Sequence, residues 1–98
     1  MVNLTAVIRC KAEHTETVLK ALIAVGDYAR LNEPGTLGYR VVQSADDPDL
    51  LITQEAFRDL EAMDAHNNGA GSKAFFAAAE GCLEQVDIYK GHEVFALQ

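Results

Sequence analysis

Tryptophan is absent from this sequence, proline occurs only twice, and no segment is rich in basic residues. Eight Lys and Arg against 15 Asp and Glu give a formal net charge of −7. An acidic chain with scattered basic residues repels phosphate backbones, so nucleic-acid binding is not expected. No apolar run approaches the ~20 residues of a membrane helix, and the first residues lack the features of a signal peptide. We expect a cytoplasmic protein that binds neither nucleic acid nor membrane.

Cysteine is also scarce. Cys10 and Cys82 are too few for a disulfide framework, and neither belongs to a Cys-x-x-Cys pair. We expect both to be buried thiols, because free cysteine usually behaves as a small hydrophobic residue. The histidines at positions 14, 66 and 92 show no metal-ligand spacing, and there is no glycine-rich phosphate loop or dinucleotide fingerprint. The sequence therefore predicts no metal and no cofactor.

The apolar pattern predicts one α+β domain over residues 1–98. The 49% hydrophobic and 23% charged content is ordinary for a globular chain with a modest core. Period-two alternation predicts strands, and helical spacing predicts one long helix and two short ones. The strands are expected at 2–10, 37–44, 50–58 and 83–90, and the helices at 13–32, 60–67 and 73–80. With the short helices taken together, the order β-α-β-β-α-β is ferredoxin-like: a four-stranded antiparallel sheet with helices on one face.

Several side chains have expected places in these elements. Asp59 and Ser72 are suited to cap the two short helices, because a short polar side chain can accept from the first free N–H groups. Ile23 is expected on the apolar side of the long helix, and Phe75 and Phe76 are expected to face inward from the last helix.

The sheet face without helices also needs a partner, because apolar residues occur on both faces of the strands. Leu50 and Ile52 alternate with Leu51 and Phe57, for example. A second copy of the chain is the simplest partner, so a homodimer is expected. The tail, residues 92–98, is too apolar to be left in water and could cross to the other subunit.

Three segments, taken in their order along the chain, resemble the antibiotic biosynthesis monooxygenase (ABM) domain family, of the dimeric α/β-barrel superfamily. The opening strand Val-x-Leu-x-Ala-Val-Ile-Arg, the turn at 33–39 and the segment from Glu55-Ala56-Phe57 through His66 to Phe75 carry the resemblance. It implies homodimers whose sheets face each other as a barrel, with a pocket between sheet and helices. Implied activities include cofactor-free oxygenation of quinols or phenols, haem degradation and isomerisation of a phosphorylated sugar, and some members have no shown activity. The chain lacks the tryptophan and the later helical histidine of the haem degraders, which disfavours haem.

His66 is the main candidate for catalysis. Its imidazole titrates near neutrality, so it can act as a general base that removes a proton from a phenol or enediol. The structural alternative is a histidine that only interacts favourably with the C-terminus of its helix. Glu55 is the second catalytic candidate, since it shares a strand face with Phe57 and could orient His66 or act as an acid. Alternatively, Glu55 forms an ion pair with Arg40 across the hairpin.

Five residues are candidates for substrate binding. The Asn3 amide could hold a carbonyl or dioxygen, and the Tyr39 hydroxyl could donate to a substrate oxygen. Phe57, Met63 and Phe75 could close an apolar pocket. The alternatives are ordinary packing in the sheet, the interface or the core.

The leading functional hypothesis is a cofactor-independent monooxygenase that oxidises a small aromatic quinol or polyphenol with O₂. The second is an isomerase on a small polar metabolite, for which Arg9, Arg40 and Arg58 would supply positive charge. The third is a non-catalytic dimeric ligand-binding or accessory domain.

Overall fold

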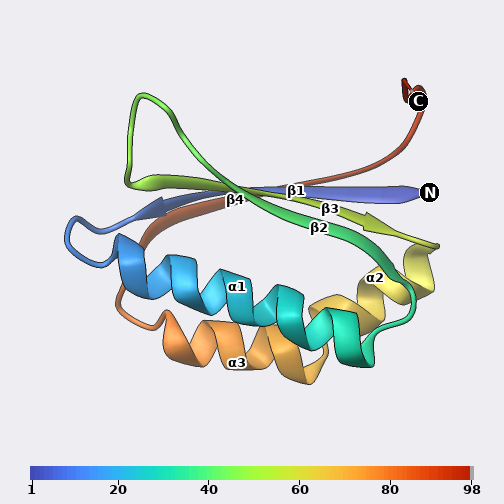
Figure 1. Ribbon diagram of the computed structural model, residues 1–98, viewed down its shortest axis with the longest axis horizontal. Coiled ribbons are helices and arrows are strands. Elements are labelled where there is room, and N and C mark those ends of the chain that lie inside the picture. Colours follow the sequence, from blue (N-terminus) through green and yellow to red (C-terminus); the bar gives the residue numbers. More distant parts are fainter. Residues whose placement is uncertain (98) are drawn as a thin grey trace.

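A four-stranded sheet carries all three helices on one face (Figure 1). The computed structural model describes residues 1–97. The strands are β1 (Val2–Cys10), β2 (Thr36–Gln43), β3 (Leu50–Phe57) and β4 (Leu83–His92), and the helices are α1 (Thr15–Asn32), α2 (Leu60–Asn67) and α3 (Ala70–Ala78). The strand order is β2-β3-β1-β4, and every neighbouring pair is antiparallel. The ferredoxin-like α+β fold is confirmed, with its second helical unit divided into α2 and α3.

Some element boundaries differ from the predicted ones. Helix α1 begins at Thr15 because Glu13 has a positive φ of 73°, outside the helical region. Strand β4 continues to His92, which pairs with Val2 of β1. Gln98, the last residue of the predicted tail, lies outside the described residues.

The two predicted caps have different outcomes. Asp59 caps α2 as predicted, since its Oδ1 accepts from the Ala62 N–H at 2.8 Å. Helix α3 instead begins at Ala70, with Gly69 at the N-cap position. Ser72 lies in the first turn of α3, where its hydroxyl donates to the His66 carbonyl at 2.7 Å. The expected cap thus ties α3 to the C-terminal end of α2.

The core lies between the helices and the inner face of the sheet. Alternate residues of β1 are buried there, and so is one side of α1. These buried residues are Leu4, Ala6, Ile8, Cys10, Val18, Leu22, Val25 and Ala29. Cys82 is buried too, so the expectation of two buried free thiols is confirmed.

Two apolar residues lie outside the predicted core. Phe75 is buried but Phe76 is 58% exposed, because consecutive helical residues point about 100° apart and only one can face the sheet. Ile23 is half exposed at the edge of α1 that faces β2.

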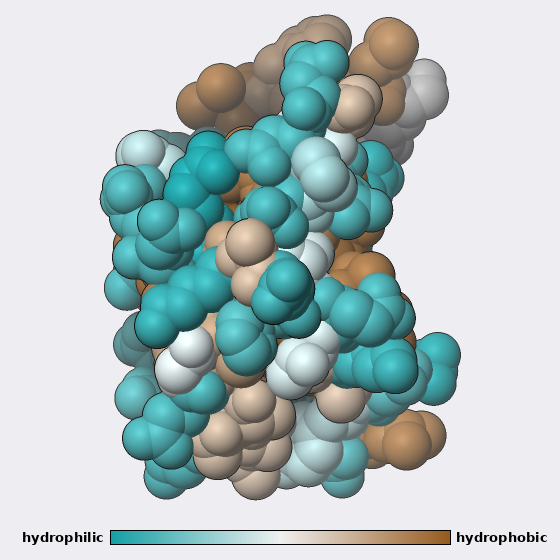
Figure 2. All heavy atoms as spheres, turned by 90° about the vertical axis from the view of Figure 1, so that its left-hand side faces the viewer, coloured by the Kyte–Doolittle hydropathy of each residue, from teal (hydrophilic) through white to brown (hydrophobic). Residues whose placement is uncertain are grey.

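The outer face of the sheet carries no helix (Figure 1). Strand pairing places Val42, Ile52 and Val7 side by side on that face. Beyond β4 the chain turns away from the sheet, and its apolar residues Val94 and Phe95 are 91% and 80% exposed. Figure 2 shows a mostly hydrophilic end of the molecule, with hydrophobic side chains gathered at the top, on the side of this outer face. None of the helices in residues 1–97 has the length and apolar character to cross a membrane.

Candidate active site

A cavity of about 300 Å³ lies between the inner face of the sheet and helices α1 and α3. Most of its wall is aliphatic or aromatic, with a few polar groups at one end and at the mouth. Its lining residues include Leu4, Ala6, Ile8, Leu22, Val25, Tyr39, Thr53, Glu55, His66, Asn67, Ser72, Phe75, Phe76, Val86, Ile88 and Lys90. An apolar hollow with few converging polar groups is the usual form of a small-molecule site.

One row of residues crosses the sheet beneath this cavity. Tyr39 of β2 pairs with Glu55 of β3, Glu55 pairs with Leu4 of β1, and Leu4 pairs with Lys90 of β4. Directly paired residues of antiparallel strands point to the same face, so all four side chains face the helices. The row places a carboxylate near the middle of the sheet and an ammonium group at its edge.

The imidazole of His66 lies between two carboxylates. Helix α2 brings it over β3, where its Nε2 is 3.2 Å from Glu55 Oε1. Its Nδ1 is 2.6 Å from Oε1 of Glu33, which follows the C-terminus of α1. The side chain of His66 is only 5% exposed, and those of Glu33 and Glu55 are 13% and 7% exposed. Each ring nitrogen therefore has its own buried carboxylate partner.

Threonine hydroxyls orient the two carboxylates. Thr36 Oγ1 donates to Glu33 Oε1 at 2.9 Å, and Thr53 Oγ1 donates to Glu55 Oε2 at 2.7 Å. Close packing also fixes the turn after Glu33, since a Cβ on Gly35 would lie 2.5 Å from the Ala62 Cβ of α2. The turn and α2 are thus in direct contact, which holds Glu33 and His66 together.

The two carboxylates favour the protonated form of His66. Burial, the largest influence, acts to lower the pKa of His66. Hydrogen bonds and charges of Glu55 and Glu33 together outweigh burial and raise that pKa above its ordinary value. A carboxylate beside each ring nitrogen favours the imidazolium, because only the charged ring carries a proton on both nitrogens.

The family model for antibiotic biosynthesis monooxygenases matches residues 1–78. The chain belongs to the antibiotic biosynthesis monooxygenase family.

Solved structures agree with this assignment in fold. A candidate antibiotic biosynthesis monooxygenase from Nitrosomonas europaea has a TM-score of 0.87 at 22% identity, covering 97% of this chain and 100% of that chain. Another from Deinococcus radiodurans has a TM-score of 0.88 at 22% identity, with coverages of 100% and 97%. A Pseudomonas aeruginosa protein has a TM-score of 0.87 at 28% identity, with coverages of 96% and 94%. A search among curated proteins finds no match.

Four of the expected site residues of this ABM domain line the cavity together: His66, Glu55, Tyr39 and Phe75. The alternative pairing of Glu55 with Arg40 does not form. Arg40 pairs in register with Gln54, so its side chain lies on the outer face of the sheet.

The other three expected residues do not line the cavity. Phe57 packs behind His66, with ring centroids 5.1 Å apart, and Met63 is buried in the core. Asn3 lies on the outer face because it alternates with the inward-facing Leu4. Its Oδ1 is shielded from solvent and has no hydrogen-bond partner within residues 1–97.

Tyr39 has a structural contact in addition to its place in the cavity wall. Its hydroxyl donates to the Leu22 carbonyl at 2.8 Å and so joins β2 to α1. Burial, with a smaller contribution from the Glu55 charge, raises the pKa of Tyr39. The phenol therefore stays neutral and does not exchange protons near neutral pH.

Sequence reasoning missed Glu33 and Lys90. Glu33 appeared only at the beginning of the turn at 33–39, and its distance of 33 positions from His66 hid their contact. Lys90 is a single basic residue in a mixed strand, and only the β1–β4 register places it over the cavity. The turn at 33–39, which is part of the family resemblance, was the available signal for Glu33.

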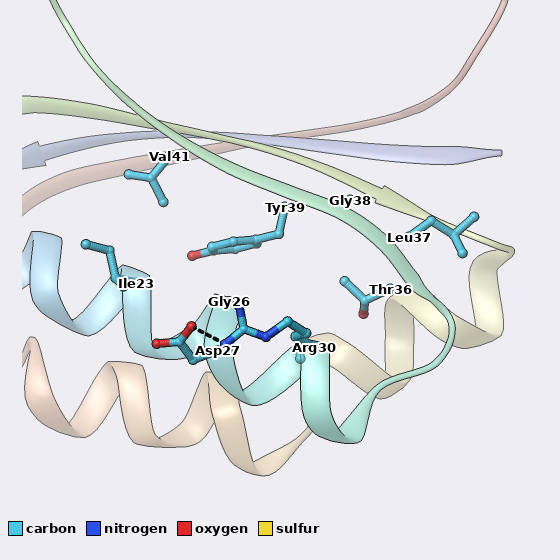
Figure 3. A pocket seen from close by; sticks show the side chains of 10 residues that line it. Ile23, Gly26, Asp27, Arg30, Thr36, Leu37, Gly38, Tyr39 and Val41 are labelled. Atoms are coloured by element: carbon cyan, nitrogen blue, oxygen red, sulfur yellow. Dashed lines mark hydrogen bonds and ion pairs between the residues drawn. The ribbon is translucent and has the colours of Figure 1, made fainter.

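Figure 3 shows a second hollow, between α1 and the beginning of β2. It is larger, at about 520 Å³, and more open. Its charged residues Asp27 and Arg30 pair with each other at 3.0 Å on the surface. The ring of Tyr39 lines both hollows. The buried Glu55 and His66 line the smaller cavity, which we take as the candidate active site.

Proposed function

We propose that this protein is a cofactor-independent monooxygenase that oxidises a small aromatic quinol or polyphenol with O₂. The observation that supports it best is the buried Glu33–His66–Glu55 cluster at one end of an apolar cavity. Phe75 and several aliphatic side chains offer the ring a dry environment. Oxygenation of a quinol inserts one atom of O₂ at a free ring carbon and releases the other as water, which gives a hydroxyquinone, so the substrate itself supplies the electrons.

The proton-transfer step is assigned to Glu55 and His66 acting as a pair. At rest the Nε2 of the charged His66 ring lies 3.2 Å from Glu55 Oε1. A substrate hydroxyl that enters the cavity gives its proton to Glu55, while His66 remains an imidazolium beside the new phenolate. The expected general-base role of His66 thus becomes a shared one: Glu55 receives the proton and the charge of His66 stabilises the oxyanion. The phenolate is the form that can pass an electron to O₂.

Oxygen uptake tests this proposal. Chelator-treated protein is mixed with a hydroquinone, and O₂ consumption is followed together with the absorbance of the hydroxyquinone product. We expect turnover without added flavin or metal, and a loss of roughly 10²–10⁴ in rate for both His66→Ala and Glu55→Gln. Glu80→Gln, an exposed change of the same charge, is the control. Unchanged turnover in both site variants would show that Glu55 and His66 do not carry the proton transfer. Absence of turnover by the folded native protein would refute the oxygenase proposal.

The isomerase hypothesis has less support from the cavity wall. Of the three arginines expected to hold an anionic metabolite, Arg9 pairs with Asp47 and Arg58 pairs with Asp59. Arg40 faces away from the cavity. Turnover that continues without oxygen would favour this hypothesis.

We further propose that the outer face of the sheet is covered by a second copy of the chain. The row of Val42, Ile52 and Val7 and the exposed tail support this, and so does the unpartnered oxygen of Asn3. Light scattering at micromolar concentration is expected to give twice the mass of the chain. A monomeric mass would contradict the proposal.

A further inference from the structure

Lys90 is a basic residue in the wall of a mostly apolar cavity. It lies at the exposed end of the lining, whereas Glu55 and His66 are buried at the other end. The chain has a net charge of −7, so a basic side chain at the cavity contrasts with the acidic character of the chain as a whole. The ion pairs within residues 1–97 involve other side chains, and Lys90 is not engaged in one.

The strand register fixes how far Lys90 lies from the proposed reacting end. Glu55, Leu4 and Lys90 occupy one row across β3, β1 and β4. Two strand spacings of roughly 4.8 Å separate the outer two backbones by about 10 Å. A benzene ring with a hydroxyl at one end and a short acidic arm at the other has a comparable length.

Two exposed apolar residues also line the cavity, one of them on β4 beside Lys90. Phe76 is 58% exposed and Ile88 is 51% exposed, yet both line the cavity. Phe76 also packs edge-to-face against Phe75, with ring centroids 5.2 Å apart. A flat ligand that reaches from Glu55 to Lys90 would cover these side chains. Their exposure in the free protein is then explained by the place of the ligand.

We propose that the substrate is an aromatic hydroxy acid: its hydroxyl meets the Glu55–His66 pair and its carboxylate meets the ammonium group of Lys90. This substrate class rests on the proposed function for the position of the hydroxyl. The charge of Lys90 also selects against neutral phenols of the same shape, because a neutral group leaves the ammonium group without a partner.

Binding measurements test the proposal without turnover. Isothermal titration compares para-hydroxyphenylacetate with its neutral amide, para-hydroxyphenylacetamide. The native protein should bind the acid more tightly than the amide. Lys90→Gln, which keeps most of the side-chain stem, should weaken binding of the acid roughly 2- to 5-fold, the range of an exposed charge contact. Binding of the amide should change less than about twofold.

Lys20→Gln is the matched control. Lys20 is exposed on α1 outside the cavity lining, and its replacement changes the net charge by the same amount. It should leave both affinities unchanged. Equal affinity for acid and amide, an acid-to-amide ratio that Lys90→Gln does not alter, or failure of both ligands to bind at millimolar concentration would each overturn the proposal.

The outcome is separable from that of the oxygenase assay. Lys90-dependent binding of the acid without oxygen uptake would refute the oxygenase and leave the ligand class standing. Rapid oxidation of neutral quinols with no preference for acids would refute the ligand class alone.

Discussion

Replacement of Glu33 by Gln tests the electrostatics of the site without touching its shape. The Nδ1–Oε1 contact of 2.6 Å joins two side chains that are 5% and 13% exposed. A hydrogen bond to a charged partner contributes about 1.5–3 kcal/mol and a neutral one about 0.5–1.5 kcal/mol. Because Gln retains an accepting oxygen for His66 and Thr36, the variant should lose about 1–1.5 kcal/mol of unfolding free energy where His66 is charged.

The sign of the pH dependence follows from the raised pKa of His66. Its contribution to stability is fully present below the unfolded-state pKa of about 6.5 and is lost as pH rises through the folded-state pKa. The destabilisation caused by Glu33→Gln should therefore be largest at about pH 6 and shrink at alkaline pH. Removal of one carboxylate also lowers the pKa of His66.

Urea unfolding across this pH range measures the first effect, and an NMR titration of the His66 ring measures the second. Glu80→Gln, which changes an exposed carboxylate beyond the end of α3, is the control for net charge. A His66 pKa in the native protein at or below 6.5 would refute the imidazolium assignment. A loss of stability that is the same at all pH values would also contradict it.

Two further predictions concern the support of the site. Gly35→Ala should destabilise the protein by about 1–3 kcal/mol in urea unfolding, because the new Cβ meets the Ala62 Cβ at 2.5 Å. Gly91→Ala has open space and should change stability far less, and equal effects would contradict the packing argument. Tyr39→Phe should cost about 1 kcal/mol through its lost bond to the Leu22 carbonyl, measured by thermal unfolding. It should leave kcat within about threefold, and a much larger fall would place the hydroxyl in the chemistry.

Local patterns in the sequence were enough to predict the order of the elements. Period-two alternation located the strands, and Asp59 marked the beginning of α2. The cap of α3 was misplaced because the hydroxyl of Ser72 has a second acceptor, the His66 carbonyl, which is visible only once α2 and α3 are packed.

The buried ionisable groups of the site were predictable only where they lie close together in the sequence. Glu55 on β3 and His66 on α2 are joined by a short connection, and both were identified. Glu33 and Lys90 come from distant parts of the chain and depend on the contact of α2 with the α1–β2 turn and on the β1–β4 register. Asn3 alternates with the inward-facing Leu4, so the strand pattern alone places its amide on the opposite face of the sheet. The assignment of Asn3 to substrate binding in the pocket therefore conflicted with the strand pattern.

The arrangement of charges around His66 distinguishes a proton-transfer pair from a lone basic histidine. A lone histidine acts as a base only in its neutral form, so its rate rises as the ring loses a proton. The pair instead needs a carboxylate at Glu55 and a charged ring at His66. These requirements give opposite dependences of rate on alkaline pH.

The pH profile of kcat/KM for quinol oxidation separates these two cases. The paired arrangement predicts that kcat/KM falls as pH rises through the raised pKa of His66. In Glu33→Gln the alkaline fall should move to lower pH. A rate that rises through neutrality to an alkaline plateau, identical in the native protein and in Glu33→Gln, would contradict it.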